Sequence, residues 1–215
     1  IVVDRNYVLR IPASLPLDVA APLLCAGITS YQPLAVWGAG PGTRVGIVGL
    51  GGLGHLAVKI ADAMGAHVTM ISHSPGKAAD AARLGADEFL LSSDSGAMRA
   101  AANSFDLIVN SASAINNIDA YLALLGTDGT MVMTGLPEGD LTMSAFSLTM
   151  QRRRLSGTNN GGIPQTQEML DFCGVHGIGA DIETIAAKDI NAAWDRVVAS
   201  DIRYRFVIDG STFAS

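Results

Sequence analysis

The sequence predicts an α/β fold with a doubly wound parallel sheet. Short apolar strands and helical segments alternate from about residue 44 to residue 157, which is typical of repeated βαβ units. A glycine-rich turn at residues 49–54 stands between an apolar strand and an amphipathic helix. After about residue 160 the alternation ends, so we expect the remaining segments to form another layer.

Each element has a local signal. An Ala- and Leu-rich stretch predicts helix over residues 15–37, with interruptions near Pro22, Gly27 and Pro33. Short apolar runs predict strands at residues 44–48, 67–72, 88–91, 105–110, 130–134 and 154–157. Helices are predicted between them at residues 53–64, 77–84, 98–103 and 118–125. Beyond residue 160 we expect helices at 166–173 and 190–199 and strands at 182–185 and 205–208.

Composition limits the classes of partner. The 215 residues are 49% hydrophobic and 16% charged, with a net charge of −6, which suits one globular core and part of a second domain. This acidic balance lacks the basic surface that nucleic acids and anionic membranes attract. No apolar run reaches the roughly 20 residues of a membrane-spanning helix. We therefore expect neither nucleic acid nor membrane as a partner.

The first residues and the cysteines bear on the location of the protein. The N-terminal segment lacks the basic-then-apolar plan of a signal peptide, and Ile1 stands where an initiator Met would be. Two cysteines, Cys25 and Cys173, cannot build a disulfide framework. We expect a cytoplasmic protein whose chain begins inside a longer one.

The turn at residues 49–54 has the spacing of a dinucleotide-binding loop. Gly49 allows a tight turn, Gly51 lets the backbone approach a diphosphate, and Gly54 permits close packing of helix on strand. The helix that begins near Gly52 offers free N–H groups and the positive end of its dipole to phosphates. The expected coenzyme contacts are Gly49, Leu50, Gly51, Gly52, Leu53 and Gly54. The alternative is a glycine-rich turn in a domain that binds no phosphate.

The bend after the second predicted strand indicates which dinucleotide is bound. NAD-specific sites place Asp or Glu there to bind the ribose 2′-hydroxyl. This chain has no carboxylate there and instead carries Ser72, His73, Ser74 and Lys77. Hydroxyls, an imidazole and an ammonium suit a 2′-phosphate of charge about −2, so we predict NADP(H). The alternative is that His73 and Lys77 are solvated loop residues and that the choice of coenzyme is loose.

Several linked motifs carry a family resemblance. They occur at residues 21–31 (APLLCAGITSY), 49–55 (GLGGLGH), 71–74 (ISHS), 83–87 (RLGAD), 128–130 (DGT) and 204–207 (YRFV). Together they resemble the zinc-containing medium-chain alcohol dehydrogenases, in particular the cinnamyl alcohol dehydrogenase subfamily and its bacterial aldehyde reductase branch. The resemblance extends over essentially the whole chain.

The resemblance implies two domains. A GroES-like catalytic domain would be built from the N-terminal portion and the extreme C-terminus, with a Rossmann-type NADP-binding domain between them. By this likeness, residues 1–27 end the N-terminal portion, residues 28–159 form the Rossmann domain, and residues 160–215 return to the catalytic domain. Members of the family pair edge to edge, which implies a homodimer through the edge strand near residues 153–157.

Zinc is the second cofactor that the resemblance implies. The family's catalytic zinc is held by two Cys and one His, with an open position for water or substrate. Cys25 matches the third of these ligands, whereas the other two and the structural zinc cluster belong upstream and are not in this sequence. By composition alone, Cys25 would be a buried small apolar residue. Thr29 is implied as a neighbour of the nicotinamide.

The resemblance also implies coenzyme contacts in the second half of the chain. Ser111, Gly135, Thr158 and Asn159 match segments that line the nicotinamide. Arg205 matches a position near the coenzyme phosphates, and an ordinary salt bridge is the alternative for it.

The implied activity is hydride transfer between NADP(H) and a primary alcohol or aldehyde, aromatic ones included, with zinc as a Lewis acid on the aldehyde oxygen. This chain alone is expected to bind the coenzyme without being catalytically complete. One alternative is a zinc-free quinone or enoyl reductase of the same superfamily, which needs no thiolate at Cys25. Another is a non-catalytic NADP-binding module. The sequence does not define which alcohol or aldehyde is used.

Overall fold

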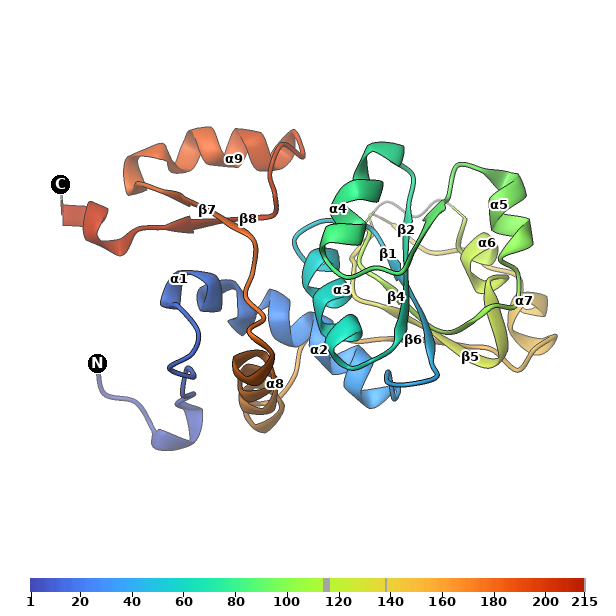
Figure 1. Cartoon of the computed structure of the whole chain (residues 1–215), viewed down its shortest axis with the longest axis horizontal. Coiled ribbons are helices and arrows are strands. Elements are labelled where there is room, and N and C mark those ends of the chain that lie inside the picture. Colours follow the sequence, from blue (N-terminus) through green and yellow to red (C-terminus); the bar gives the residue numbers. More distant parts are fainter. Residues whose placement is uncertain (114–116, 138, 215) are drawn as a thin grey trace.

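The strands of this chain form two separate sheets, which stand apart in the molecule (Figure 1). The computed structural model describes residues 1–113, 117–137 and 139–214. Within these residues a six-stranded sheet has the order β3-β2-β1-β4-β5-β6, and a two-stranded sheet is formed by β7 and β8. All neighbouring strands in both sheets run parallel. The predicted doubly wound α/β fold is confirmed.

The order of the large sheet creates a switch point beside β1. The strands are β1 Arg44–Val48, β2 His67–Ser72, β3 Glu88–Leu91, β4 Phe105–Asn110, β5 Leu125–Met133 and β6 Arg154–Gly157. The chain adds β2 and β3 on one side of β1 and then returns to add β4 on the other side. In such sheets the loops at the carboxyl ends of β1 and β4 diverge, which leaves a crevice where ligands bind.

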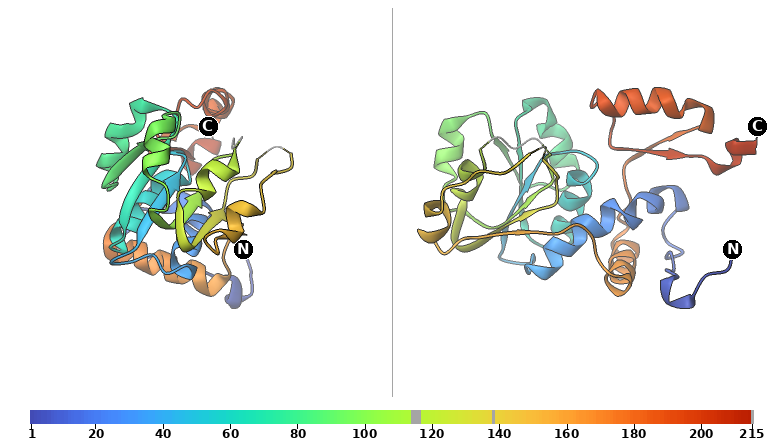
Figure 2. Two further views of the ribbon diagram at one scale, coloured as in Figure 1. Left: turned by 90° about the vertical axis from the view of Figure 1, so that its right-hand side faces the viewer. Right: turned by 180° about the vertical axis from the view of Figure 1, so that it is seen from behind.

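Helices cover both faces of the large sheet, and a second lobe stands at one end of the molecule (Figures 1 and 2). The helices are α1 Leu17–Ala20, α2 Ala26–Val36, α3 Gly54–Ala63, α4 Ala78–Arg83, α5 Ser95–Ala100, α6 Ile118–Leu122, α7 Phe146–Thr149, α8 Ile163–His176 and α9 Ile190–Val198. The second lobe contains α9 and the strands β7 Ile182–Ile185 and β8 Arg205–Ile208. Both termini lie at the same end as this lobe.

The core is divided by the large sheet into two apolar clusters. Successive side chains of a strand point to opposite faces, so Val45 and Ile47 of β1 join one cluster and Val48 joins the other. The first cluster includes buried residues of α2, α3 and α8, and the second includes those of α6. Because α8 shares a core with α2 and α3, the chain after residue 160 stays attached to the lobe of the large sheet.

The helix at residues 26–36 corrects one prediction from the sequence. The chain bends by 60° between Leu17–Leu24 and Ala26–Val36, which agrees with the break expected near Pro22. The break expected near Gly27 is this same bend, because α2 begins at Ala26, whereas the break expected near Pro33 is wrong, because α2 continues to Val36. Gly27 lies in this helix for packing, since a Cβ there would stand 2.9 Å from Leu23 Cβ and 3.1 Å from Met169 Sδ of α8.

Other boundaries differ only locally from the predictions. The bounds of β7 and β8 are those predicted, whereas β5 begins at Leu125, earlier than expected. The helix after the glycine loop begins at Gly54 rather than near Gly52. In the described part of the chain, no single helix has the length and apolar composition to span a membrane, although the bent pair Leu17–Leu24 and Ala26–Val36 has them jointly.

Candidate functional site

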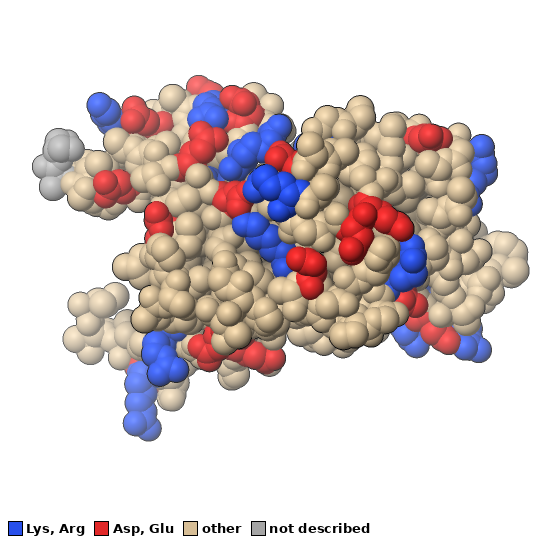
Figure 3. Space-filling view, in the orientation of Figure 1, with Lys and Arg blue, Asp and Glu red and all other residues tan. Residues whose placement is uncertain are grey.

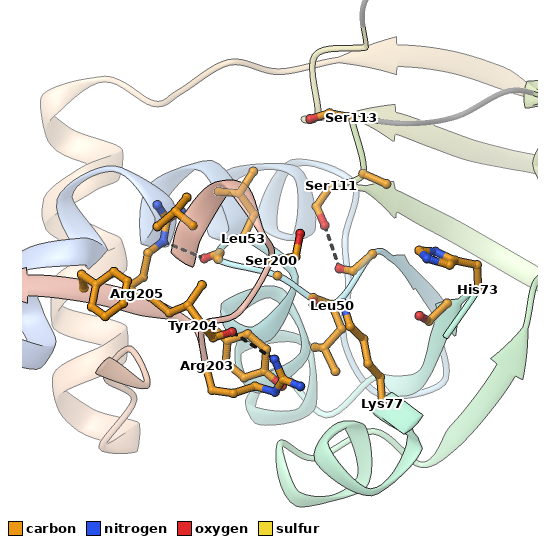
Figure 4. Close-up of a pocket in the computed structure, with 18 of the residues that line it drawn as sticks. Leu50, Leu53, His73, Lys77, Ser111, Ser113, Ser200, Arg203, Tyr204 and Arg205 are labelled. Carbon is orange, nitrogen blue, oxygen red and sulfur yellow. Dashed lines mark hydrogen bonds between the residues drawn. The ribbon is translucent and has the colours of Figure 1, made fainter. Parts of the chain in front are cut away.

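A large cavity lies at the switch point of the sheet and has a volume of about 670 Å³. Its walls come from the loop after β1, the bend after β2, the end of β4 and the segment that leads into β8 (Figure 4). The sequence-predicted residues that line it are Gly49, Leu50, Gly51, Gly52, Leu53, Ser72, His73, Lys77, Ser111 and Arg205. The fold therefore gathers residues from four separate stretches of sequence into one site.

The glycine loop turns tightly because Gly49 and Gly54 have no side chain. Gly49 has φ of +90°, which favours glycine, and its N–H donates to Ile71 O at 3.1 Å. A Cβ on Gly54 would stand 1.8 Å from Gly49 O, so helix and strand approach too closely for any other residue. A Cβ on Gly51 would meet no atom within 4 Å. Gly49 and Gly54 thus form the turn, while Gly51 leaves its outer surface open to the cavity.

Helix α3 starts directly after the loop residues that line this cavity. Helix α3 begins at Gly54, and no described side chain caps its N-terminus with a hydrogen bond. The first N–H groups of a helix have no partner within the helix, and the helix dipole makes this end positive. The loop and helix together provide the backbone geometry that binds a phosphate group.

Ser111 and His55 hold the loop in place. The Ser111 hydroxyl lies 2.8 Å from Val48 O and 2.9 Å from Gly49 O, which links the loop to the end of β4. His55 is fully buried, and burial lowers its pKa to about 4, so the ring is neutral at pH 7. Its Nε2 accepts the N–H of Asp181 at 3.2 Å. Its Nδ1 therefore carries the proton and donates to Gly51 O at 3.0 Å.

The bend after β2 brings Lys77 against the loop. The Lys77 ammonium donates to Leu50 O at 2.8 Å, and partial burial, followed by the charge of Arg203, lowers its pKa. Ser72 is buried with its hydroxyl accepting from Ser74 N at 3.2 Å, while His73 is exposed at the cavity. Ser74 is not among the residues that line the cavity, and none of the lining residues carries a carboxylate.

Arg205, at the start of β8, closes the cavity from the other side. Its Nε donates to Gly52 O at 3.3 Å, and burial lowers the pKa of its guanidinium. No carboxylate of the described residues lies within ion-pair distance of Arg205, so the ordinary salt bridge is not what the structure contains. A partly buried arginine without a carboxylate partner suits an anionic ligand.

The other predicted coenzyme contacts lie around a second, smaller cavity of about 420 Å³ at the ends of β5 and β6. It is lined by Gly135, Thr158 and Asn159. A Cβ on Gly135 would stand 2.4 Å from the carbonyl of Ala112, a residue that lines the large cavity. The two cavities therefore lie next to each other along the carboxyl edge of the sheet.

Sequence reasoning missed the residues that the C-terminal segment contributes to the large cavity. These include Trp194, Ser200, Ile202, Arg203, Tyr204 and Phe206. Tyr204 stacks on His55 with ring centroids 4.8 Å apart, which attaches this segment to α3. The motif at residues 204–207 was the sequence signal for this segment, but it indicated Arg205 and not the neighbouring residues that also line the cavity.

Comparison with known proteins agrees with this geometry. The family model described as zinc-binding dehydrogenase matches residues 52–174, which is more than half of the chain. The chain belongs to the zinc-binding dehydrogenase family. The expected resemblance is thereby confirmed at the level of the family.

Similar proteins of this family are longer than the chain. An NADP-dependent alcohol dehydrogenase C of Mycolicibacterium smegmatis is 57% identical over 215 residues, which is 100% of this chain and 62% of that protein. A cinnamyl alcohol dehydrogenase from Sorghum bicolor has 49% identity and a TM-score of 0.93, over 96% of this chain and 59% of that one. CAD from Helicobacter pylori, solved with NADP(H), has 38% identity and a TM-score of 0.87, over 97% of this chain and 60% of that one. The chain thus spans about three fifths of the length of these relatives.

The described residues of this zinc-binding dehydrogenase do not form a zinc site. Cys25 is exposed at the start of α2, so the alternative that it is a buried apolar residue is wrong. Cys173 is fully buried, lies 3.7 Å from Met169 Sδ, and has its pKa raised to about 12 by burial. No group of three or more His, Cys, Asp or Glu is placed to hold a metal in the part of the chain described. A single thiol does not satisfy the three protein ligands that zinc requires.

Thr29 lies one helical turn beyond Cys25, and its hydroxyl is engaged by the backbone. Its Oγ1 donates to Cys25 O at 2.8 Å and stands 3.2 Å from Asn159 O. The side chain is 6% exposed and lines neither cavity. Thr29 therefore joins α2 to the end of β6, next to the smaller cavity.

Two glycine substitutions separate the roles of the loop. Gly54→Ala places a methyl group on the Gly49 carbonyl, so we expect the free energy of unfolding to fall by about 3 kcal/mol. Gly51→Ala meets no atom, so its unfolding free energy should stay within about 0.5 kcal/mol of wild type. Urea unfolding measures both, and NADPH fluorescence titration should show at least about tenfold weaker binding for Gly51→Ala. Equal destabilisation by the two substitutions would contradict these roles.

Proposed function

We propose that this chain binds NADP(H) along the carboxyl edge of its large sheet. The observation that carries the proposal is the large cavity, where an open glycine loop and three cationic side chains meet without a lining carboxylate. Gly51 and Gly52 offer the close backbone approach that a diphosphate needs. Ser72, His73 and Lys77 line the part of the cavity that we assign to the adenosine 2′-phosphate, and Ser74 belongs to the same bend. The contact of Lys77 with Leu50 O supports this assignment more than a solvated loop.

The smaller cavity suits the nicotinamide end of the coenzyme. Gly135, Thr158 and Asn159 line it, and Ser111 stands between it and the glycine loop. Arg205 lies at the glycine loop, where it would neutralise the diphosphate. NADP(H), when bound, supplies or accepts the hydride. These residues would orient the nicotinamide and exclude water from it.

Within a longer protein, we propose an NADP(H)-dependent dehydrogenase that interconverts a primary alcohol and an aldehyde. Relatives named as alcohol dehydrogenases and as an aldehyde reductase of Escherichia coli support a small-molecule alcohol or aldehyde substrate, aromatic ones included. Residues 1–27 and 160–215 would belong to its catalytic domain and residues 28–159 to the Rossmann domain. We place the protein in the cytoplasm, without nucleic acid or membrane partners.

Cys25 is the residue of this chain that we assign to zinc. Its exposure at the start of α2 leaves the thiol accessible, which supports a metal ligand more than a zinc-free quinone or enoyl reductase. The remaining ligands would come from outside the described residues, so we expect this chain alone to bind coenzyme without turnover. In that limited sense the chain behaves as an NADP-binding module.

Coenzyme preference tests the proposal through Lys77. The purified chain should bind NADPH more tightly than NADH in isothermal calorimetry, because Lys77 gains a phosphate partner. Lys77→Glu should weaken NADPH binding at least about tenfold and remove the preference, since it places a carboxylate in the cavity. The control Lys188→Glu changes the same charge on an exposed residue outside the cavity and should keep the preference. Equal affinity of the unaltered chain for both coenzymes would refute the proposal.

We also propose that two chains pair through the free edge of β6. Among the described residues, β6 pairs with β5 on one side only, and an open edge can accept a further strand. The connection between β5 and β6 exposes apolar side chains, among them Leu136 at 81% and Phe146 at 66%.

Sedimentation velocity should detect a dimer that Phe146→Glu weakens. Phe213→Glu, at a residue 67% exposed in the other lobe, should leave it intact. If the chain sediments as a monomer at all concentrations, the proposed dimer is refuted.

A further inference from the structure

Positive charge is concentrated at the large cavity of a protein that is acidic overall. The chain has a net charge of −6, yet the charged side chains that line this cavity are Lys77, Arg203 and Arg205. In the space-filling view, Lys and Arg side chains gather over the junction of the two lobes (Figure 3). An anion in the cavity would therefore meet cations from both lobes.

Arg203 is the one of these cations that the sequence did not indicate. It lies in the segment between α9 and β8, and its side chain is half exposed. Its Nε donates to Asp80 Oδ2 at 3.1 Å, and its Nη1 donates to Ile202 O at 3.2 Å. These two bonds hold the guanidinium at the cavity wall.

The negative charge of Asp80, next to Arg203, is compensated by its neighbours. The Tyr204 hydroxyl donates to its Oδ2 at 2.9 Å, and Arg83 lies 3.5 Å from its Oδ1. The Tyr204 hydrogen bond and the charges of Arg83 and Arg203 lower the pKa of Asp80, although partial burial opposes them. With two arginines and one hydroxyl around it, the carboxylate is neutralised. Asp80 is thus a positioning residue for Arg203.

Arg203 and Lys77 face the same part of the cavity from different lobes. Figure 4 shows the two side chains on either side of Leu50. The charge of Arg203 acts on the Lys77 ammonium, whose described partner is the neutral carbonyl of Leu50. Two cations held close together repel each other unless an anion lies between them. A phosphate with a charge of about −2 would balance both.

We propose that Arg203 is a second specificity-determining residue, which binds the 2′-phosphate of NADP(H) opposite Lys77. The inference rests on the proposed function and extends it, because the choice of coenzyme is then shared between the bend after β2 and the C-terminal segment. Arginine is suited to this role, since its planar guanidinium can donate two parallel hydrogen bonds to phosphate oxygens. Arg205, which lies beside Gly52, would bind the diphosphate instead.

The test compares two coenzymes on the purified chain and three variants. Isothermal calorimetry measures the affinity for NADP⁺ and for NAD⁺. Arg203→Met should weaken NADP⁺ binding about tenfold and change NAD⁺ binding less than about twofold. Arg203→Lys keeps the charge and should retain most of the affinity for NADP⁺. Arg99→Met removes an exposed arginine of α5 that does not line the cavity, and should leave both affinities unchanged.

The outcomes distinguish this inference from the proposed function. If the unaltered chain binds NADP⁺ and NAD⁺ equally, the proposed function itself is wrong. If it prefers NADP⁺ and Arg203→Met keeps the whole preference, only the role of Arg203 is overturned. An equal loss for both coenzymes would assign Arg203 a structural role and would also overturn the inference. Circular dichroism checks the fold, and if Arg203→Met is unfolded, Arg203→Gln takes its place under the same criteria.

Discussion

The contact between Gly54 and the carbonyl of Gly49 is the constraint on which the site depends. With no side chain at residue 54, the chain leaves β1, turns within a few residues and enters α3 against the same strand. The N-terminus of α3 therefore faces the carboxyl edge of the sheet at the switch point between β1 and β4. A methyl group at residue 54 would push the helix away, and the backbone donors would no longer meet at one place.

A network of buried and charged contacts then holds the second lobe against this turn. His55 binds the glycine loop through one ring nitrogen and the backbone of Asp181 through the other. The Asp181 carboxylate pairs with Lys59 of α3 and, at 2.9 Å, with Arg83 of α4. The segment that carries Arg203 and Arg205 is thereby fixed to the helices that carry the loop. Two parts of the chain that are distant in sequence share one cavity for this reason.

Local sequence signals predicted much of the fold and part of the site. The alternation of strands and helices, the bounds of β7 and β8, and the positions of the glycine loop follow from periodicity and from the limits that a side chain imposes. The continuity of α2 through Pro33 did not follow, because burial of this helix in the core overrides helix propensity there. The contribution of Arg203 could not be predicted from the sequence either, because its approach to Lys77 depends on how the two lobes pack and not on any local pattern.

The proposed coenzyme site requires that the backbone around residues 51–53 bind the diphosphate of a nicotinamide coenzyme. Titration of the ¹⁵N-labelled chain with NADP⁺, followed by amide resonances, observes these donors directly. We expect the largest shifts at the amides of Gly51, Gly52 and Leu53, saturating together with those of the bend at residues 72–77. Saturable binding that leaves the three loop amides unshifted would contradict the proposed coenzyme site.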